Sequence, residues 1–191
     1  MNKTLFAKEL RANLFVSGII AAVLAMYIGT IVAMYDPKLG ESLDLMMQSM
    51  PELFAAFGMS MQATTLLEFM LNYLYGFLLT IFILVLILVM VNKLMVRYLD
   101  RGAMAYLLAT PNSRTRIALT MVGVMVAILV GLCALTTALE VGFGEGMFPG
   151  ELDFEALARV NAGLLALWLA LAGLCFLSAC LFSNATAALW V

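Results

Sequence analysis

The chain has 191 residues, of which 65% are hydrophobic and 12% are charged. Because a soluble globular domain carries about 25% charged residues, this composition excludes a water-soluble particle. The sequence contains no histidine, which removes the commonest general base and the commonest zinc ligand. All three cysteines fall inside apolar stretches, where we interpret them as small apolar side chains rather than metal ligands.

Four stretches of the chain are apolar for long enough to cross a bilayer as helices, which takes about 20 residues each. They lie at about 15–35, 70–92, 117–139 and 160–182. The first stretch is too long for the apolar core of a signal peptide, so we interpret it as a retained span. We therefore predict an all-α polytopic membrane protein, a helical bundle with a single transmembrane domain over residues 1–191.

Residues 2–14 form the first element in chain order, ahead of the first span. Apolar side chains at helical spacing form one stripe, with the lysines and the arginine elsewhere: Leu5, Phe6, Leu10 and Leu14. This pattern predicts an amphipathic helix that lies flat at the inner membrane interface. The alternative is a charged extension of the first span.

Two acidic segments connect the spans: one lies between the first and second spans, the other between the third and fourth. In residues 36–68, apolar side chains recur at three- and four-residue spacing, which favours short amphipathic helices on the membrane surface over a substrate site. Residues 140–159 are rich in glycine, so we expect them to turn outside the membrane. Asp153 is a candidate N-cap for the helix that enters the fourth span.

The distribution of charge predicts the orientation of the chain. Eight of the ten basic residues lie in the N-terminal segment and in residues 93–116, whereas ten of the twelve acidic residues lie in the other two connections. Short basic loops remain cytoplasmic. We expect the N-terminus and residues 93–116 to be cytoplasmic and residues 36–68 and 140–159 to be external.

Small residues recur at four-residue spacing in three of the spans. Small faces let helix backbones approach closely in lipid, which predicts a tight bundle. The three sets are Ala21, Ala25 and Gly29; Gly123, Ala127 and Gly131; and Ala162, Ala166 and Ala170.

The basic connection at 93–116 contains a short helix by its composition. Residues 103–109 are good helix formers, and Pro111 ends the helix because it pushes the preceding residue towards an extended conformation. Asn112 or Ser113 is placed to cap the third span. An apolar, aromatic helix on the cytosolic face suits the groove of a partner protein. The alternative is a lipid-facing connector whose charges only set the topology.

The same connection resembles a motif of ABC-2-type transporter permeases, E-R-G-T-x-x-x-L-L-S-T-P-[VI]-S-R. Here it reads D-R-G at 100–102, Y-L-L-A-T-P at 106–111 and S-R at 113–114. Residues 2–11 and 50–58 also look like the entry helix and the outer helix of that family. Asp100 stands where the family often has Glu, Ala109 where it often has Ser, and Thr120 where a Lys is frequent.

The resemblance implies that residues 93–116 form a cytoplasmic coupling loop, whose helix sits in a cleft of a separate ATPase subunit. The residues that would form or shape this contact are Asp100, Arg101, Gly102, Tyr106, Leu107, Leu108, Thr110, Pro111 and Arg114. Permeases of this type usually have six spans, and the last two spans of that pattern are not present in this sequence. Either that pair lies outside this sequence or the protein is a shortened relative.

The resemblance predicts a permease subunit of an ATP-binding-cassette exporter in the plasma membrane, of prokaryotic type. The sequence has no G-x-x-x-x-G-K-[ST] motif, so we expect no enzyme activity here, with ATP and Mg in the cytoplasmic ATPase partner. The other expected partners are the lipid bilayer and a second permease copy or a homologous permease, without nucleic acid. The apolar bundle suits a lipid, a hydrophobic drug or a membrane-active peptide as substrate.

Two other classes of function are weighed against the permease. One is a non-transporting four-span assembly or immunity-type partner protein, which would need no ATPase. The other is an intramembrane enzyme, which the lack of histidine and of paired carboxylates inside the spans disfavours.

Overall fold

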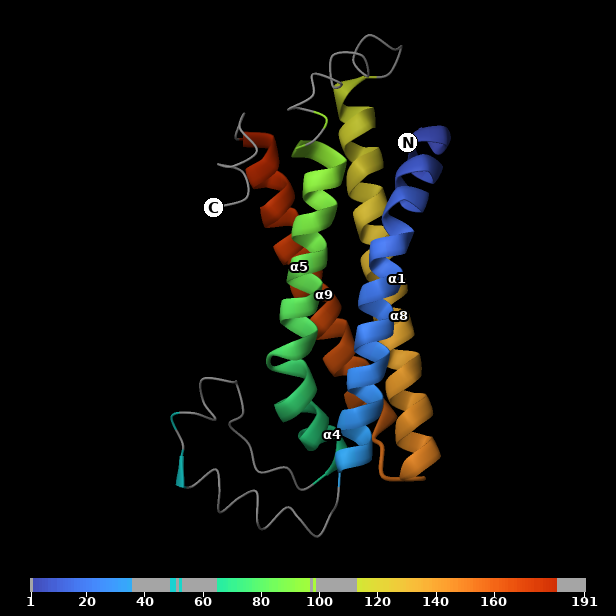
Figure 1. The fold of residues 1–191 in the computed structure, drawn as a ribbon, viewed down its shortest axis with the longest axis vertical. Coiled ribbons are helices and arrows are strands. Elements are labelled where there is room, and N and C mark those ends of the chain that lie inside the picture. The colour runs from blue at the N-terminus through green and yellow to red at the C-terminus, as the bar shows by residue number, and fades with distance from the viewer. Residues whose placement is uncertain are drawn as a thin grey trace. The chain divides into compact units, whose positions relative to one another are not determined.

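A computed structural model of the chain describes residues 2–35, 49, 50, 52, 65–96, 98 and 113–181. Within this part the fold consists of helices without strands, and four helical segments are long and apolar enough to cross a membrane. They are Lys3–Met34, Leu66–Val96, Arg114–Met147 and Phe154–Leu181 (Figure 1). The protein is an all-α polytopic membrane protein, as the composition predicts.

Helix α1 (Lys3–Met34) runs without a break through the boundary that we expected near residue 14. The Asn2 side chain starts it, since its Oδ1 accepts hydrogen bonds from the backbone N–H groups of Thr4 and Leu5, at 3.1 and 3.3 Å. The prediction of a separate interfacial helix is therefore wrong. Residues 3–14 instead extend the first membrane-spanning helix, as the alternative had it.

The second helical segment has five parts, and two of them are π-helical. Its order is α4 (Leu66–Met70), η1 (Leu71–Tyr75), a turn, α5 (Leu78–Val91) and η2 (Asn92–Val96). A capping box starts α4: Thr65 Oγ1 accepts from the Glu68 N–H at 3.2 Å, and Glu68 Oε2 accepts from the Thr65 N–H at 3.1 Å. Short π segments change the helical register, which apolar composition does not reveal.

Helix α8 (Arg114–Met147) continues beyond the expected end of the third span. Residues 140–147, which we expected to turn outside the membrane, belong to this helix in spite of their glycines. A Cβ added at Gly144 would meet Leu152 Cδ2 at 3.3 Å and Leu66 Cδ2 at 3.6 Å, so this glycine permits a close approach of both leucines to α8. The chain turns only after Met147, where Gly150 has a φ of 81°.

Helix α9 (Phe154–Leu181) starts at the predicted cap. Asp153 Oδ1 accepts hydrogen bonds from the backbone N–H groups of Glu155 and Ala156, each at 3.0 Å. These bonds satisfy two of the amide groups that an α-helix leaves free at its start. The prediction of Asp153 as N-cap is confirmed.

The chain divides into two compact units. The first unit comprises Met1–Ile20, Ile83–Leu132 and Leu164–Val191, and the second comprises Ala21–Phe82 and Cys133–Gly163. Each unit has an apolar core, with Leu86, Met121 and Trp168 fully buried in the first and Leu24, Ile28 and Leu74 in the second. Both also bury polar side chains, which are unusual inside a membrane protein and point to specific interactions. These are Glu9, Asn13, Ser17 and Thr120 in the first unit, and Asn72, Thr136, Glu140 and Asn161 in the second.

Of the three predicted small-residue faces, the one on α1 contacts another helix at its last residue, Gly29. A Cβ added at Gly29 would meet the Phe143 ring at 3.3 Å, so this glycine permits a close approach of two helices. The face on α9 is instead exposed along its length, and on α8 Ala127 and Gly131 are exposed. Within the described residues, the set on α9 and the residues Ala127 and Gly131 on α8 therefore do not form helix–helix contacts.

Candidate functional site

The predicted coupling residues lie mostly outside the described residues. This applies to Asp100, Arg101, Gly102, Tyr106, Leu107, Leu108, Thr110 and Pro111. Arg114 is described: it is the first residue of α8 and is exposed. Ser113 precedes it, and its Oγ accepts a hydrogen bond from the backbone N–H of Arg116 at 3.3 Å, so Ser113 caps this helix as predicted.

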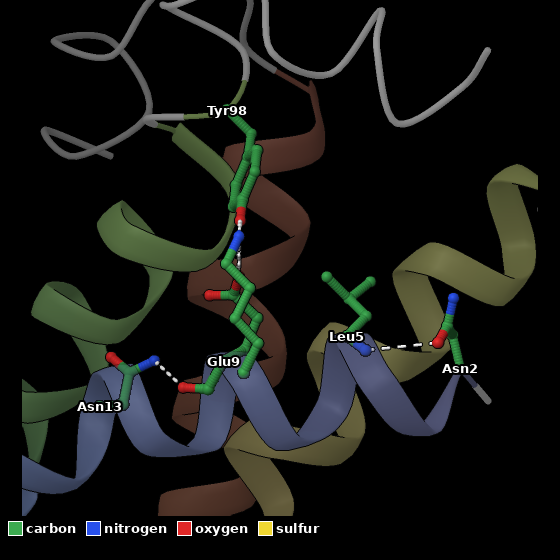
Figure 2. A network of polar contacts seen from close by, with 6 residues as sticks. Asn2, Leu5, Glu9, Asn13 and Tyr98 are labelled. Carbon is green, nitrogen blue, oxygen red and sulfur yellow. Dashed lines mark hydrogen bonds and ion pairs between the residues drawn. The ribbon is translucent and has the colours of Figure 1, made fainter. Parts of the chain in front are cut away.

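The residue just before the undescribed part of this loop, Tyr98, is held by α1. Its hydroxyl group donates a hydrogen bond to Glu9 Oε1 at 2.5 Å (Figure 2). Lys8 Nζ donates to the Tyr98 oxygen at 3.1 Å and lies 3.6 Å from Glu9 Oε1. A hydrogen bond from a phenol to a carboxylate is charge-assisted, which makes it shorter and stronger than a neutral one.

Burial and the hydrogen bond to Glu9 raise the pKa of Tyr98 above its usual value, with burial as the larger cause. The neighbouring Lys8 opposes this effect. The phenol therefore stays protonated and keeps its hydrogen for Glu9 throughout the physiological pH range.

On the other side of the loop, the first turns of α8 are hydrogen-bonded to the start of α1. The backbone N–H of Asn2 donates to Thr120 Oγ1 at 3.0 Å, and this hydroxyl donates to the Arg116 carbonyl at 2.7 Å. Thr120 is fully buried. The N-terminal end of α1 thus binds a residue on each side of the segment 99–112.

The face of α1 that turns inward in the first unit is polar. Glu9, Asn13 and Ser17 follow one another at four-residue spacing and are 4%, 0% and 6% exposed. Asn13 Nδ2 donates to the Glu9 carbonyl at 2.9 Å (Figure 2). Ser17 Oγ donates to the Asn13 carbonyl at 3.0 Å. Leu14 and Phe15 are 53% and 77% exposed, which suits contact with lipid.

This arrangement reverses part of the expected amphipathic pattern. Of the predicted apolar stripe, Leu5 is buried in protein and Leu14 is exposed, so the stripe does not lie on one surface. In a membrane, an exposed face is apolar, and polar side chains turn towards other helices. The spacing of Glu9, Asn13 and Ser17 is the sequence signal that identifies this inner face.

No family model, no curated protein and no solved structure matches the chain. The arrangement itself must therefore indicate the chemistry of this region. Within residues 2–35, 65–96 and 113–181 and the few described positions between them, no three His, Cys, Asp or Glu side chains form a group that could hold a metal ion. Two of the contacts, Tyr98–Glu9 and Asn2–Thr120, join parts of the first unit that are far apart in the sequence.

A second buried polar cluster lies in the second unit, and sequence reasoning did not find it. Glu140 Oε2 accepts from Tyr75 Oη at 2.9 Å and from Asn161 Nδ2 at 2.7 Å, and Tyr75 Oη lies 2.9 Å from Asn161 Oδ1. Tyr75 is the last residue of η1, and the other two side chains belong to α8 and α9. We expected Glu140 in an external loop, whereas it is a fully buried residue of α8.

Proposed function

We propose that the chain is the transmembrane permease subunit of an ATP-binding-cassette exporter. Residues 100–114 supply the coupling contact with a separate cytoplasmic ATPase subunit, which holds ATP and Mg. The observation that carries the proposal is the pair of ties from α1 to both sides of this segment, Tyr98 to Glu9 and Thr120 to Asn2. The likeness of residues 100–114 to the coupling loop of ABC-2-type permeases and the four membrane-spanning helical segments support it further.

The two ties give a physical route from the loop into the membrane. When ATP draws the ATPase subunits together, the docked loop moves, and the Tyr98–Glu9 hydrogen bond carries this displacement to α1. Helix α8 begins at Arg114, so the same displacement reaches the third span through a continuous helix. ATP then shifts the balance between an inward-open and an outward-open arrangement, because the ATPase binds the two with different affinity.

The exposed small residues on two helices support a second membrane subunit as a further partner. Ala162, Ala166 and Ala170 of α9 are all exposed, as are Ala127 and Gly131 of α8. Faces of this kind let another helix approach closely where lipid provides no hydrophobic drive. A second permease copy or a homologous permease would cover them. A non-transporting assembly protein would present the same faces, so the ATPase contact is the feature to test.

The test is a photo-crosslinking experiment on the full chain in its native membrane. A photoreactive residue at position 107 is compared with one at position 15, where Phe15 is 77% exposed on a membrane-spanning helix. We expect position 107 to capture an ATPase subunit and position 15 to capture lipid. Capture of lipid alone at both positions would overturn the permease assignment and favour the non-transporting assembly protein.

A further inference from the structure

The Glu140 cluster of the second unit is a closed triangle of polar atoms. Its three corners are Tyr75 Oη, Glu140 Oε2 and the side-chain amide of Asn161, and its three sides measure 2.9, 2.7 and 2.9 Å. The three residues are 8%, 0% and 4% exposed, so the cluster is buried within the protein. Each side of the triangle has the length of a hydrogen bond, and each therefore needs one hydrogen atom.

The hydrogens that Tyr75 and Asn161 supply are too few for three bonds. The Tyr75 hydroxyl carries a single hydrogen. The Asn161 amide reaches Glu140 through its nitrogen and Tyr75 through its oxygen, so it supplies one hydrogen to the triangle. The third hydrogen must come from Glu140, and a carboxyl group has one only when it is protonated.

With a proton on Oε2, all three contacts become hydrogen bonds that run in one direction. Glu140 donates to Tyr75, Tyr75 donates to the Asn161 carbonyl oxygen, and the Asn161 amide donates to Glu140. Exchanging the oxygen and nitrogen of the Asn161 amide reverses the direction of the ring and leaves the count of hydrogens unchanged. The requirement for a third hydrogen thus does not depend on how the amide is oriented.

Among the described residues, no lysine or arginine forms an ion pair with Glu140. The titratable side chains that face the cluster are Tyr75 from η1 and Cys133 from α8, whose Sγ lies 3.6 Å from the Asn161 carbonyl oxygen. In the described part of the chain, the two ion pairs are Lys8–Glu9 and Arg159–Glu155, and neither involves Glu140. The other carboxyl oxygen, Oε1, is buried and has no hydrogen-bond partner among the residues that the structure describes. An isolated carboxylate in such a site costs several kcal/mol.

We propose that Glu140 is a proton-binding site: its carboxyl group holds a proton that closes a ring of three hydrogen bonds with Tyr75 and Asn161. The proton is the ligand, and the ring is the feature that binds it. On dissociation the proton passes to water. The three contacts among the carboxylate, the Tyr75 hydroxyl and the Asn161 amide then share only two hydrogens. Proton binding thereby stabilises the contact among η1, α8 and α9. The inference does not depend on the proposed transport function.

Infrared spectroscopy of the full chain in lipid vesicles tests the proposal, because a protonated carboxyl group has a C=O stretching band that a carboxylate lacks. We expect wild-type protein at neutral pH to show this band, and ¹³C-labelled glutamate to shift it. Glu140→Gln, which keeps a neutral side chain of the same length, should abolish the band. Glu145→Gln is the matched control, since Glu145 lies on the same helix and outside the triangle.

A second variant keeps the test decisive if Glu140→Gln fails to fold. Tyr75→Phe removes the acceptor of the Glu140 hydrogen, so we expect it to shift the frequency of the carboxyl band or to abolish it. Absence of the band from wild-type protein at neutral pH would overturn the proposal. A band that is the same in wild type, Glu140→Gln and Tyr75→Phe would overturn it equally, because the proton would then belong to another carboxyl group.

Discussion

The Tyr98 hydroxyl group donates a 2.5 Å hydrogen bond to Oε1 of Glu9, although the two residues are 89 positions apart in the sequence. Glu9 is only 4% exposed, so this bond replaces water as the partner of the carboxylate. It connects Tyr98, which lies two residues after the end of the second helical segment, to α1.

Replacement of Tyr98 by phenylalanine removes the hydroxyl group that donates a short hydrogen bond to the buried Glu9 carboxylate. Loss of a buried partner of this kind costs about 1–3 kcal/mol. We expect Tyr98→Phe to lower the unfolding temperature of the purified chain and to weaken the coupling of ATP hydrolysis to transport. Tyr27→Phe is the control, because the Tyr27 ring packs against Phe82 in the second unit without a hydrogen bond recorded for its hydroxyl among the described residues. Equal stability of the two variants would contradict the role of the bond.

The stability of the chain should also depend on pH through Tyr98. Burial and Glu9 raise the pKa of this phenol in the folded protein above its unfolded value of about 10. The folded state therefore favours the protonated phenol, and the associated stability is complete below about pH 10 and is lost as the pH rises through the raised pKa. Unfolding curves recorded from neutral to alkaline pH should show a smaller alkaline loss for Tyr98→Phe than for wild type. Parallel losses in both proteins would show that Tyr98 does not contribute.

The proposed coupling contact predicts that Tyr106→Ala and Leu107→Ala separate ATP hydrolysis from transport. Each change removes an apolar side chain from the segment that we propose to dock on the ATPase, while the membrane-spanning helices keep their sequence. The measurement compares substrate transport with ATP hydrolysis in a complex reconstituted in vesicles. Leu174→Ala is the control, since Leu174 is 64% exposed on α9. Transport at the wild-type rate in both loop variants would refute the docking role.

The two glycines of α1 should respond differently to the same substitution. A Cβ at Gly18 would have no neighbour within 4 Å, whereas a Cβ at Gly29 would meet Phe143 at 3.3 Å. Gly→Ala inside a helix stabilises it by about 0.5–1 kcal/mol when no contact opposes it. We expect Gly18→Ala to raise the unfolding temperature. Gly29→Ala should not raise it, because the Phe143 ring must move to admit the added methyl group. An equal increase for both variants would mean that Phe143 does not constrain the helix.

Local sequence patterns were sufficient for the features that depend on neighbouring residues. The four apolar stretches became membrane-spanning helical segments, and Asp153 and Ser113 cap helices as predicted. Transfer to lipid depends on the apolar side chains of one stretch, and an N-cap bonds amide groups two or three residues away. Neither requires knowledge of distant parts of the chain.

The polar contacts inside the fold could not be predicted in this way. The hydrogen-bond partners of Tyr75 are 65 and 86 positions away in the sequence. Tyr75 is also the last residue of the π-helical segment η1, and composition does not reveal such a segment. The glycines of residues 140–147 indicated a turn, but these residues continue helix α8, and Glu140 is fully buried.

The sequence by itself determined that the chain crosses a membrane as helices, because the free energy of transfer to lipid is a sum over neighbouring apolar residues. Only the tertiary structure decided which face of each helix turns inward. In the N-terminal part of α1 it is the polar face with Glu9 and Asn13, while Leu14 and Phe15 remain exposed. Hydropathy does not contain this information, since a buried polar side chain is stabilised only by the particular hydrogen-bond partner that another helix brings to it.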